Sequence, residues 1–145
     1  RMRLDVAVNL LTMQALNKGK ITVLGGDQTR PNIHIDDITD VYLHFLNNPN
    51  FEGIFNAGFE NISILDIANM VSLKTNAEIE IKPSNDPRSY RINSDKLLKT
   101  GFKPSKTVEN AIQEMIDLYR NGVLEDLEEN YNLKWMEKNK LYKLD

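Results

Sequence analysis

A switch in the spacing of apolar residues, between positions 32 and 46, is the feature that most constrains how this chain can fold. Ile33 and Ile35 alternate with Asn32 and His34, which predicts a strand with one buried face. The period then changes to that of an amphipathic helix, whose expected apolar stripe consists of Ile38, Val41, Tyr42, Phe45 and Leu46. A strand followed almost directly by a helix is therefore expected here.

The residues that flank this strand–helix unit support the same interpretation. Gly25 and Gly26 supply the backbone freedom that a tight turn before the strand requires. Asp36 is expected to cap the helix, and Asp37 to place negative charge where the helix dipole is positive. Arg30 then lies beside the turn, at the start of a rigid unit.

Helices and strands alternate along the rest of the chain, which predicts the α/β class. The first helix, residues 4–17, is apolar on two sides, so both sides are expected to be covered. Ser63 and Asp66 resemble a capping box with Asp in place of Glu. Other helices are expected after Ser94, after Thr107 and from about residue 124, and other strands at residues 20–24, 53–57 and 77–82.

Composition argues against several classes of function. The net charge of −3 is unlike a nucleic-acid-binding surface, which is usually basic. No apolar run approaches the ~20 residues that a membrane span needs, and the first residues do not resemble a secretory signal. The chain has no cysteine, which excludes disulfides and thiolate chemistry and fits a reducing, cytoplasmic location. Its 145 residues suffice for one domain or for a fragment of a larger one.

Three segments carry a resemblance to a known family. They are residues 25–42 (GGDQTRPNIHIDDITDVY), residues 53–58 (GIFNAG) and residues 86–104, which begin DPRSYRI and end GFKP. In order and rough spacing they resemble the C-terminal part of the extended short-chain dehydrogenase/reductases, the NAD-dependent epimerases and dehydratases that modify nucleotide sugars. The resemblance covers nearly the whole chain but only about the C-terminal half of the family's length.

This resemblance implies the α/β fold of a substrate-binding C-terminal portion of a Rossmann-type enzyme, without the N-terminal dinucleotide-binding half. Residues from about 30 to 75 would include elements that complete a Rossmann sheet. The chain has neither a Gly-x-Gly-x-x-Gly turn near its start nor a Tyr-x-x-x-Lys pair, which in the family serve the cofactor and catalysis. We therefore expect no catalytic or cofactor-binding residue here, with NAD or NADP held mainly by the absent half and the fragment inactive alone.

Two arginines are candidates for binding a nucleotide sugar through its diphosphate. Guanidinium groups suit a diphosphate better than ammonium groups do, and Arg30 and Arg88 both lie beside turns, where a clamp can be built. In the family, the arginine that leads the strand clamps the diphosphate, which implies this role for Arg30. Arg3 is a weaker third candidate. From the residues alone, the alternative is that these arginines form ion pairs with Asp27, Asp36 or Asp86.

Asn9 interrupts the apolar pattern of the first helix. An amide in mid-helix either faces water or has a specific partner. In the family, a similarly placed asparagine lies at the sugar-nucleotide pocket, which makes Asn9 a further candidate for substrate binding.

Other functions remain as alternatives. His34 with Asp36 and Asp37 falls short of a metal-ligand set, and no metal site is expected. The chain could be a non-catalytic nucleotide-binding module, or an interaction scaffold whose two-sided first helix serves a partner protein. Without the N-terminal half, the doubly apolar first helix and the unpaired strands are expected to expose apolar surface and to drive self-association or homo-oligomer formation.

Overall fold

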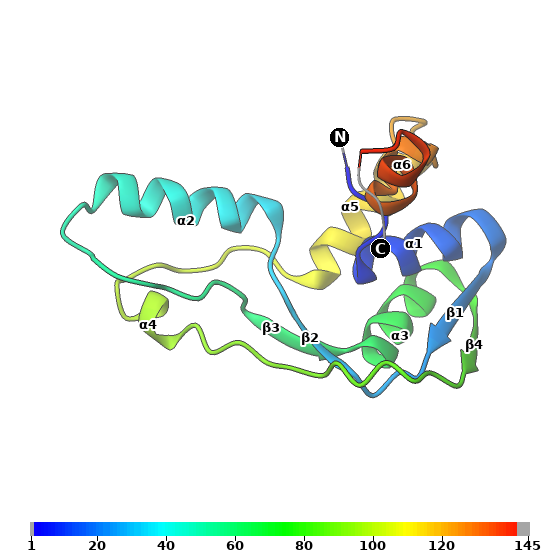
Figure 1. Ribbon diagram of the computed structural model, residues 1–145, viewed down its shortest axis with the longest axis horizontal. Helices are drawn as coiled ribbons and strands as arrows, with labels where there is room; N and C mark the ends of the chain where they lie inside the picture. Colours follow the sequence, from blue (N-terminus) through cyan, green and yellow to red (C-terminus); the bar gives the residue numbers. More distant parts are fainter. Residues whose placement is uncertain (1, 142–145) are drawn as a thin grey trace.

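Residues 2–141, which a computed structural model describes, are arranged as a body of helices around one strand pair and an arm that projects from it (Figure 1). The elements in chain order are α1 (Ala7–Lys18), β1 (Lys20–Leu24), β2 (Thr29–Asn32), α2 (Ile35–Asn47), β3 (Glu60–Ser63), α3 (Ile64–Thr75), β4 (Glu78–Lys82), α4 (Asp95–Leu98), α5 (Val108–Arg120), the 3-10 helix η1 (Glu128–Asn130) and α6 (Asn132–Lys138). None of the helices in this part of the chain is both long and apolar enough to span a membrane. The predicted α/β class is confirmed.

The body is built on the parallel pair β1–β4, in which Lys20 lies opposite Glu78 and Leu24 opposite Lys82. Ile21 and Val23 of β1 are fully buried. They belong to the main core with residues of α1, α3 and α5, namely Val8, Leu11, Ala15, Ile67, Ala68, Val71, Val108, Ile112 and Ile116. The helices cover the apolar face of the pair, whereas the charged residues Lys20, Glu80 and Lys82 of the two strands are at least partly exposed and form ion pairs with one another.

Helix α1 is covered on two sides, as its sequence predicts. Val8 and Leu11 face the main core. Met13 faces a second cluster with Leu4 and with Leu124 from the C-terminal segment. Gly19 ends the helix in the left-handed conformation, with φ of 62°, which glycine adopts without steric cost.

The arm consists of α2, α4 and irregular segments: α2 is connected to β2 and β3, and α4 to β4 and α5 (Figure 1). Strands β2 and β3 pair antiparallel, with Arg30 opposite Ile62, and lie where the arm meets the body. Farther out, the arm has its own small apolar cluster, formed by Val41, Leu97 and Phe102 with Phe45, Phe55, Ala57 and Phe59. This cluster holds one side of α2.

The junction between β2 and α2 differs from the expectation in two ways. The strand ends at Asn32, so Ile33 and Ile35 are not part of it. The N-cap of α2 is His34, not Asp36: its Nδ1 accepts a hydrogen bond of 3.2 Å from the backbone N–H of Asp36. Both aspartates lie in the first turn, where the helix dipole favours them as expected.

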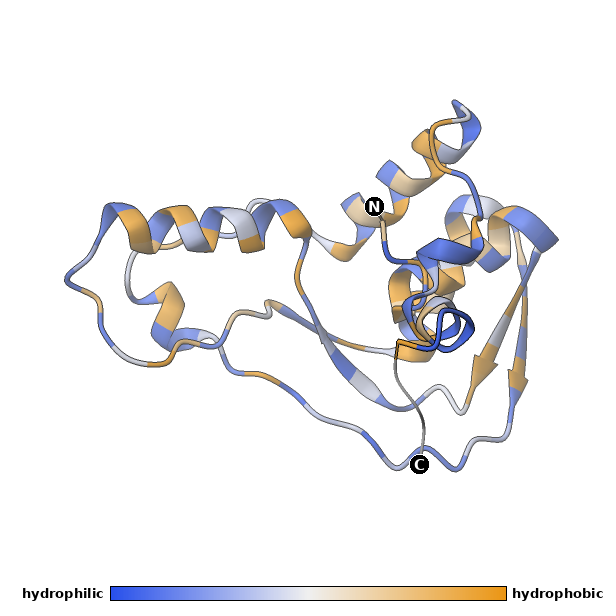
Figure 2. Cartoon of the chain, turned by 45° about the horizontal axis from the view of Figure 1, so that its top comes forward, coloured by the Kyte–Doolittle hydropathy of each residue, from blue (hydrophilic) through white to orange (hydrophobic). Residues whose placement is uncertain are grey.

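The expected apolar stripe of α2 is only half correct. Val41 is buried in the arm cluster, and Phe45 packs against it. Tyr42 and Leu46, however, are 70% and 76% exposed, because nothing in residues 2–141 covers that side of the helix. Apolar residues recur along both sides of α2 in the hydropathy view (Figure 2).

The strand expected at residues 53–57 does not form. This segment is irregular, and Ile54 is 87% exposed. A strand requires a hydrogen-bonding neighbour, and the ladder beside β2 is taken instead by β3, a strand that the apolar pattern of Glu60–Ser63 did not predict. Phe55 and Ala57 use their side chains to pack in the arm cluster.

The capping predictions have mixed outcomes. The box expected at α3 forms only in part: the Ser63 hydroxyl accepts from the Asp66 N–H at 3.0 Å as an N-cap does, but the bond of 2.6 Å to the Asp66 carboxylate comes from that hydroxyl and takes the place of the backbone bond of a capping box. Thr107 caps α5 with Asn110 as its reciprocal partner. Ser94 precedes α4 but does not cap it, because its hydroxyl exchanges two 3.0 Å hydrogen bonds with the backbone of Gly58.

The single helix expected from about residue 124 is wrong. Leu124 is buried against Leu4 and Met115, η1 follows, and α6 starts only at Asn132. The buried Asn130 explains the break: its side-chain amide donates to the Glu125 carbonyl at 3.1 Å, and its own carbonyl accepts from the Leu4 N–H at 2.7 Å. Tertiary contacts therefore replace the helical hydrogen bonds that the sequence pattern indicated.

We predict that Asp37→Ala lowers the free energy of unfolding by about 2–4 kcal/mol, because it leaves backbone donors unpaired in a buried site. The Asp37 carboxylate is 1% exposed and accepts from the Ser105 N–H, the Ser105 hydroxyl and the Lys106 N–H, at 2.9, 3.0 and 3.2 Å. Urea unfolding measures the change. Asp40→Ala, at an exposed position of the same helix, is the control and should stay within about 0.5 kcal/mol of the wild type. Equal effects of the two changes would contradict the prediction.

Candidate functional site

Arg30 and Arg88, separated by 58 residues in the sequence, lie together in space. We call this pair the arginine clamp. Both guanidinium groups contact the carboxylate of Asp86. Arg88 makes two hydrogen bonds, from Nε to Oδ1 at 2.7 Å and from Nη2 to Oδ2 at 2.8 Å, and Arg30 Nη2 lies 3.4 Å from Oδ2. Of the three aspartates considered as ion-pair partners from the sequence, Asp86 is the one that meets both arginines.

The two halves of the arginine clamp differ in how firmly they are held. Arg30 leads β2, and its side chain is only 19% exposed. Its guanidinium donates to the carbonyls of Thr29 and Arg88 and lies 5.3 Å from the centre of the Tyr90 ring, a cation–π contact. The Arg88 side chain is 75% exposed and is held by Asp86. Arg30 is therefore the fixed half of the clamp and Arg88 the half that can move.

The opposite charges in the clamp stabilise each other's ionised forms. The hydrogen bonds from Arg88 hold the pKa of the Asp86 carboxyl well below its usual range, with a smaller contribution from the charge of Arg30. The same hydrogen bonds raise the pKa of the Arg88 guanidinium. The site thus contains a carboxylate anion between two cations, an arrangement that can also hold a phosphate group.

Arg3 and Asn9 lie elsewhere, on the wall of a cavity of about 660 Å³ between the N-terminus of α1, β2 and α5. Asn9 Nδ2 donates to the Arg3 carbonyl at 2.8 Å, and Arg3 Nε donates to the Asp5 carboxylate at 2.5 Å. The lining includes Pro31 and Asn32, which follow Arg30 in the chain, but neither arginine of the clamp. The structure therefore groups the four candidates as two pairs, adjoining the same strand.

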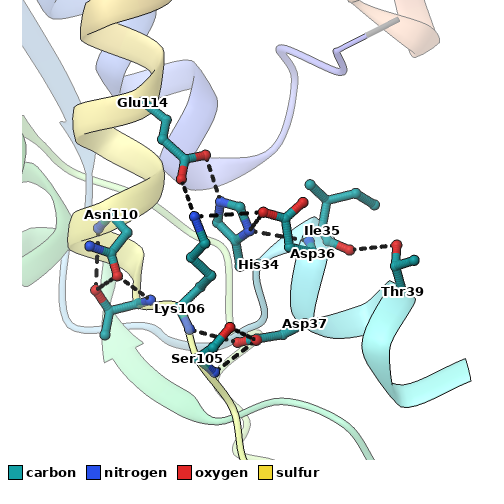
Figure 3. Close-up of polar contacts among 10 residues, drawn as sticks. His34, Ile35, Asp36, Asp37, Thr39, Ser105, Lys106, Asn110 and Glu114 are labelled. Atoms are coloured by element: carbon teal, nitrogen blue, oxygen red, sulfur yellow. Dashed lines mark hydrogen bonds and ion pairs between the residues drawn. The ribbon is translucent and has the colours of Figure 1, made fainter. Parts of the chain in front are cut away.

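The cavity is also lined by His34 and Glu114, which belong to a polar cluster that sequence reasoning did not connect (Figure 3). His34 Nε2 lies 3.0 Å from the Glu114 carboxylate, and Lys106 Nζ donates to the other carboxylate oxygen at 2.7 Å. Lys106 Nζ also lies 3.6 Å from the Asp36 carboxylate. Nothing in the sequence indicates that Glu114, which follows His34 by 80 positions, is its partner.

This polar cluster has the ligand types of a metal site, since donor atoms of His34, Asp36 and Glu114 lie within 4.8 Å of one another. The Lys106 ammonium already interacts with both carboxylates. The N–H of Asp36 also donates to His34 Nδ1, which leaves Nε2 as the nitrogen that carries the proton and donates to Glu114. The cluster is best described as a charge-assisted link between α2 and α5.

The chain is similar in fold to several solved structures, although no family model matches it. One match is the UDP-N-acetylglucosamine 4-epimerase of Bacillus cereus, with 19% identity and a TM-score of 0.71 over 82% of this chain. Another is the dTDP-glucose 4,6-dehydratase of Bacillus anthracis, with 21% identity and a TM-score of 0.70 over 91%. A third is the UDP-glucuronic acid 4-epimerase of Bacillus cereus in complex with UDP-glucuronic acid and NAD, with 24% identity and a TM-score of 0.67 over 83%.

These matches share one property: the chain covers only 44%, 43% and 41% of the respective matched chains. The part that it matches is their C-terminal portion. The fold implied by the three sequence segments is thus confirmed: it is that of the C-terminal portion of these epimerase and dehydratase structures.

We predict that Glu114→Gln lowers the free energy of unfolding, and that this effect decreases as the pH falls below 4.5. The hydrogen bond from Lys106 lowers the pKa of the Glu114 carboxyl below its ordinary 4.5 in the folded chain. The ion pair therefore stabilises the fold above pH 4.5, and its contribution is lost as the pH falls further. Because the carboxylate is 44% exposed, we expect less than about 1 kcal/mol at pH 7.

The measurement is the difference in free energy of unfolding between wild type and Glu114→Gln at a series of pH values from 3 to 7. Glu109→Gln is the control, because Glu109 lies on the same helix with only a 3.8 Å contact to Lys74. A difference for Glu114→Gln that does not shrink below pH 4.5 would show that the ion pair is not its source.

Proposed function

We propose that this chain, which has the fold of the C-terminal part of nucleotide-sugar epimerases and dehydratases, is the substrate-binding portion of an NAD(P)-dependent enzyme of that kind. Its role is to hold the nucleoside diphosphate of a nucleotide sugar. The single observation that carries the proposal is the convergence of Arg30 and Arg88 on one anion, the Asp86 carboxylate. The fold likeness supports the same class of ligand, since one of the matched structures holds UDP-glucuronic acid.

A diphosphate suits the arginine clamp for chemical reasons. Planar guanidinium groups donate two parallel hydrogen bonds to oxyanions, and Arg88 already does so to Asp86. A diphosphate carries more negative charge than a carboxylate and offers more acceptor oxygens. Arg30, fixed on β2, would set the position of the ligand, and Arg88 would close on it from the solvent side.

In the complete enzyme, NAD or NADP would supply the hydride chemistry and would be bound mainly by the half that this chain lacks. The residues here would contribute binding energy at the diphosphate, remote from the reacting sugar. Such remote binding positions a substrate for chemistry that other groups perform. Arg3 and Asn9, on the cavity beside β2, would contact another part of the nucleotide sugar. We accordingly propose that the chain has no catalytic activity by itself.

The arm supports the proposal that residues from about 30 to 75 complete a larger sheet. Residues 53–57 run without a strand partner, and one side of α2 presents Ile35, Tyr42 and Leu46 at 70%, 70% and 76% exposure. An unpaired segment can add to the edge of a sheet, and an exposed apolar helix face can be covered by a neighbouring part of a larger enzyme. In the isolated chain these surfaces would favour self-association, which also leaves an interaction scaffold as a second candidate function.

The binding proposal predicts that the wild-type chain binds one class of nucleoside diphosphate and that Arg30→Ala and Arg88→Ala each weaken binding by about tenfold or more. Isothermal titration calorimetry with UDP, GDP, CDP and dTDP measures both. Arg91→Ala, at an exposed position near Arg88, is the matched control and should leave the affinity unchanged. Absence of binding to all four nucleotides would contradict the proposal and favour the scaffold.

The arm proposal predicts that the isolated chain self-associates through α2. Replacing Tyr42 and Leu46 together by lysine should shift the chain toward monomer in light scattering over a wide range of concentrations. Leu73→Lys is the control, because Leu73 is 84% exposed but lies on α3 in the body. A wild-type chain that is monomeric throughout the range would contradict this prediction.

A further inference from the structure

The segment that carries Arg88 also carries the anion that occupies the arginine clamp. Resting on the proposed function, we infer that Asp86 is a built-in competitor: its carboxylate takes the place of the diphosphate between Arg30 and Arg88, and ligand binding has to displace it. Asp86 would then set how tightly the site holds its ligand, without contacting that ligand itself.

The contacts of the Asp86 carboxylate are those expected of a bound anion. Oδ1 accepts from Arg88 Nε at 2.7 Å and from the Arg88 backbone N–H at 3.0 Å. Oδ2 accepts from Arg88 Nη2 at 2.8 Å and lies 3.4 Å from Arg30 Nη2. Donors of both guanidinium groups are thus directed at one carboxylate. A phosphate group would need the same donors.

Hydrogen bonds hold the segment that carries Arg88 against β2 but do not prevent the Asp86 carboxylate from moving out of the clamp. Immediately after Arg88, the Ser89 hydroxyl accepts from the Thr29 N–H at 3.0 Å, and the Tyr90 N–H donates to the Thr29 carbonyl at 3.3 Å. These bonds hold Arg88 next to β2. On the other side of Arg88, the backbone N–H of Asp86 donates to Ser84 within the same irregular segment. Rotation about the side-chain bonds of Asp86 would therefore withdraw the carboxylate without disturbing the anchor to β2.

Charge explains why a diphosphate can displace the Asp86 carboxylate and why this displacement weakens binding. Two guanidinium groups and one carboxylate leave a single net positive charge in the clamp, whereas a diphosphate carries at least two negative charges. The hydrogen bonds from Arg88 lower the pKa of Asp86 below its usual range, so the competing carboxylate is charged at neutral pH. Neutralising Asp86 should therefore strengthen binding rather than weaken it.

The experiment compares the wild-type chain with Asp86→Asn, using UDP and inorganic pyrophosphate as probes in calorimetric titrations at fixed ionic strength. Asparagine keeps an oxygen for the Arg88 backbone N–H but removes the charge. We expect Asp86→Asn to bind both probes roughly two- to fivefold more tightly, the range for one exposed ion pair. Asp27→Asn is the matched control, since it removes the same charge from an exposed position three residues before Arg30.

A second measurement follows the Arg88 Nε–H resonance by NMR. Pyrophosphate should shift it in the wild type, and Asp86→Asn should shift it before any ligand is added. Equal or weaker binding by Asp86→Asn, with a wild type that binds, would overturn the inference and leave the proposed function intact. If the wild type and the variant bind neither probe, nor GDP, CDP or dTDP, the proposed function fails and this inference fails with it.

Discussion

The buried carboxylate of Asp37 is the contact on which the placement of the arm depends. It accepts hydrogen bonds from the backbone of Ser105 and Lys106, just before α5, and so fixes the first turn of α2 against the body. His34 reinforces the contact by capping α2 and meeting Glu114 of α5 (Figure 3). Only two residues separate β2 from α2, so these links also hold the strand that carries Arg30. The contacts at the N-terminus of α2 therefore fix the position of the arginine clamp.

Features that depend on neighbours in the sequence were predictable. The N-cap at Ser63, the strands β1 and β4, and the amphipathic face of α5 all follow from local spacing and hydrogen bonding. The meeting of Arg30 with Arg88 could be expected only from a family resemblance, because no periodicity links residues 58 positions apart. Asp86 was one of three partners that the sequence allowed, and only the folded chain distinguishes it.

Features that depend on distant partners were not predictable. The segment at residues 53–57 has a strand-like composition, but a strand needs a neighbour, and β2 pairs with β3 instead. The C-terminal pattern indicates one helix, yet Asn130 donates a hydrogen bond to the Glu125 carbonyl and accepts one from the Leu4 N–H, and the helix breaks there. The two apolar sides of α2 look alike in the sequence, and only one of them finds a core.

Two neighbouring sites adjoin β2, the arginine clamp and the cavity with Arg3 and Asn9 on its wall. We propose that the diphosphate binds in the clamp. A crystal structure of the chain with a bound nucleoside diphosphate tests this claim most directly. The account predicts phosphate oxygens within about 3 Å of the guanidinium groups of both Arg30 and Arg88, in the place of the Asp86 carboxylate. A nucleotide seated in the cavity, with its phosphates distant from Arg30 and the Asp86 contacts unchanged, would contradict it.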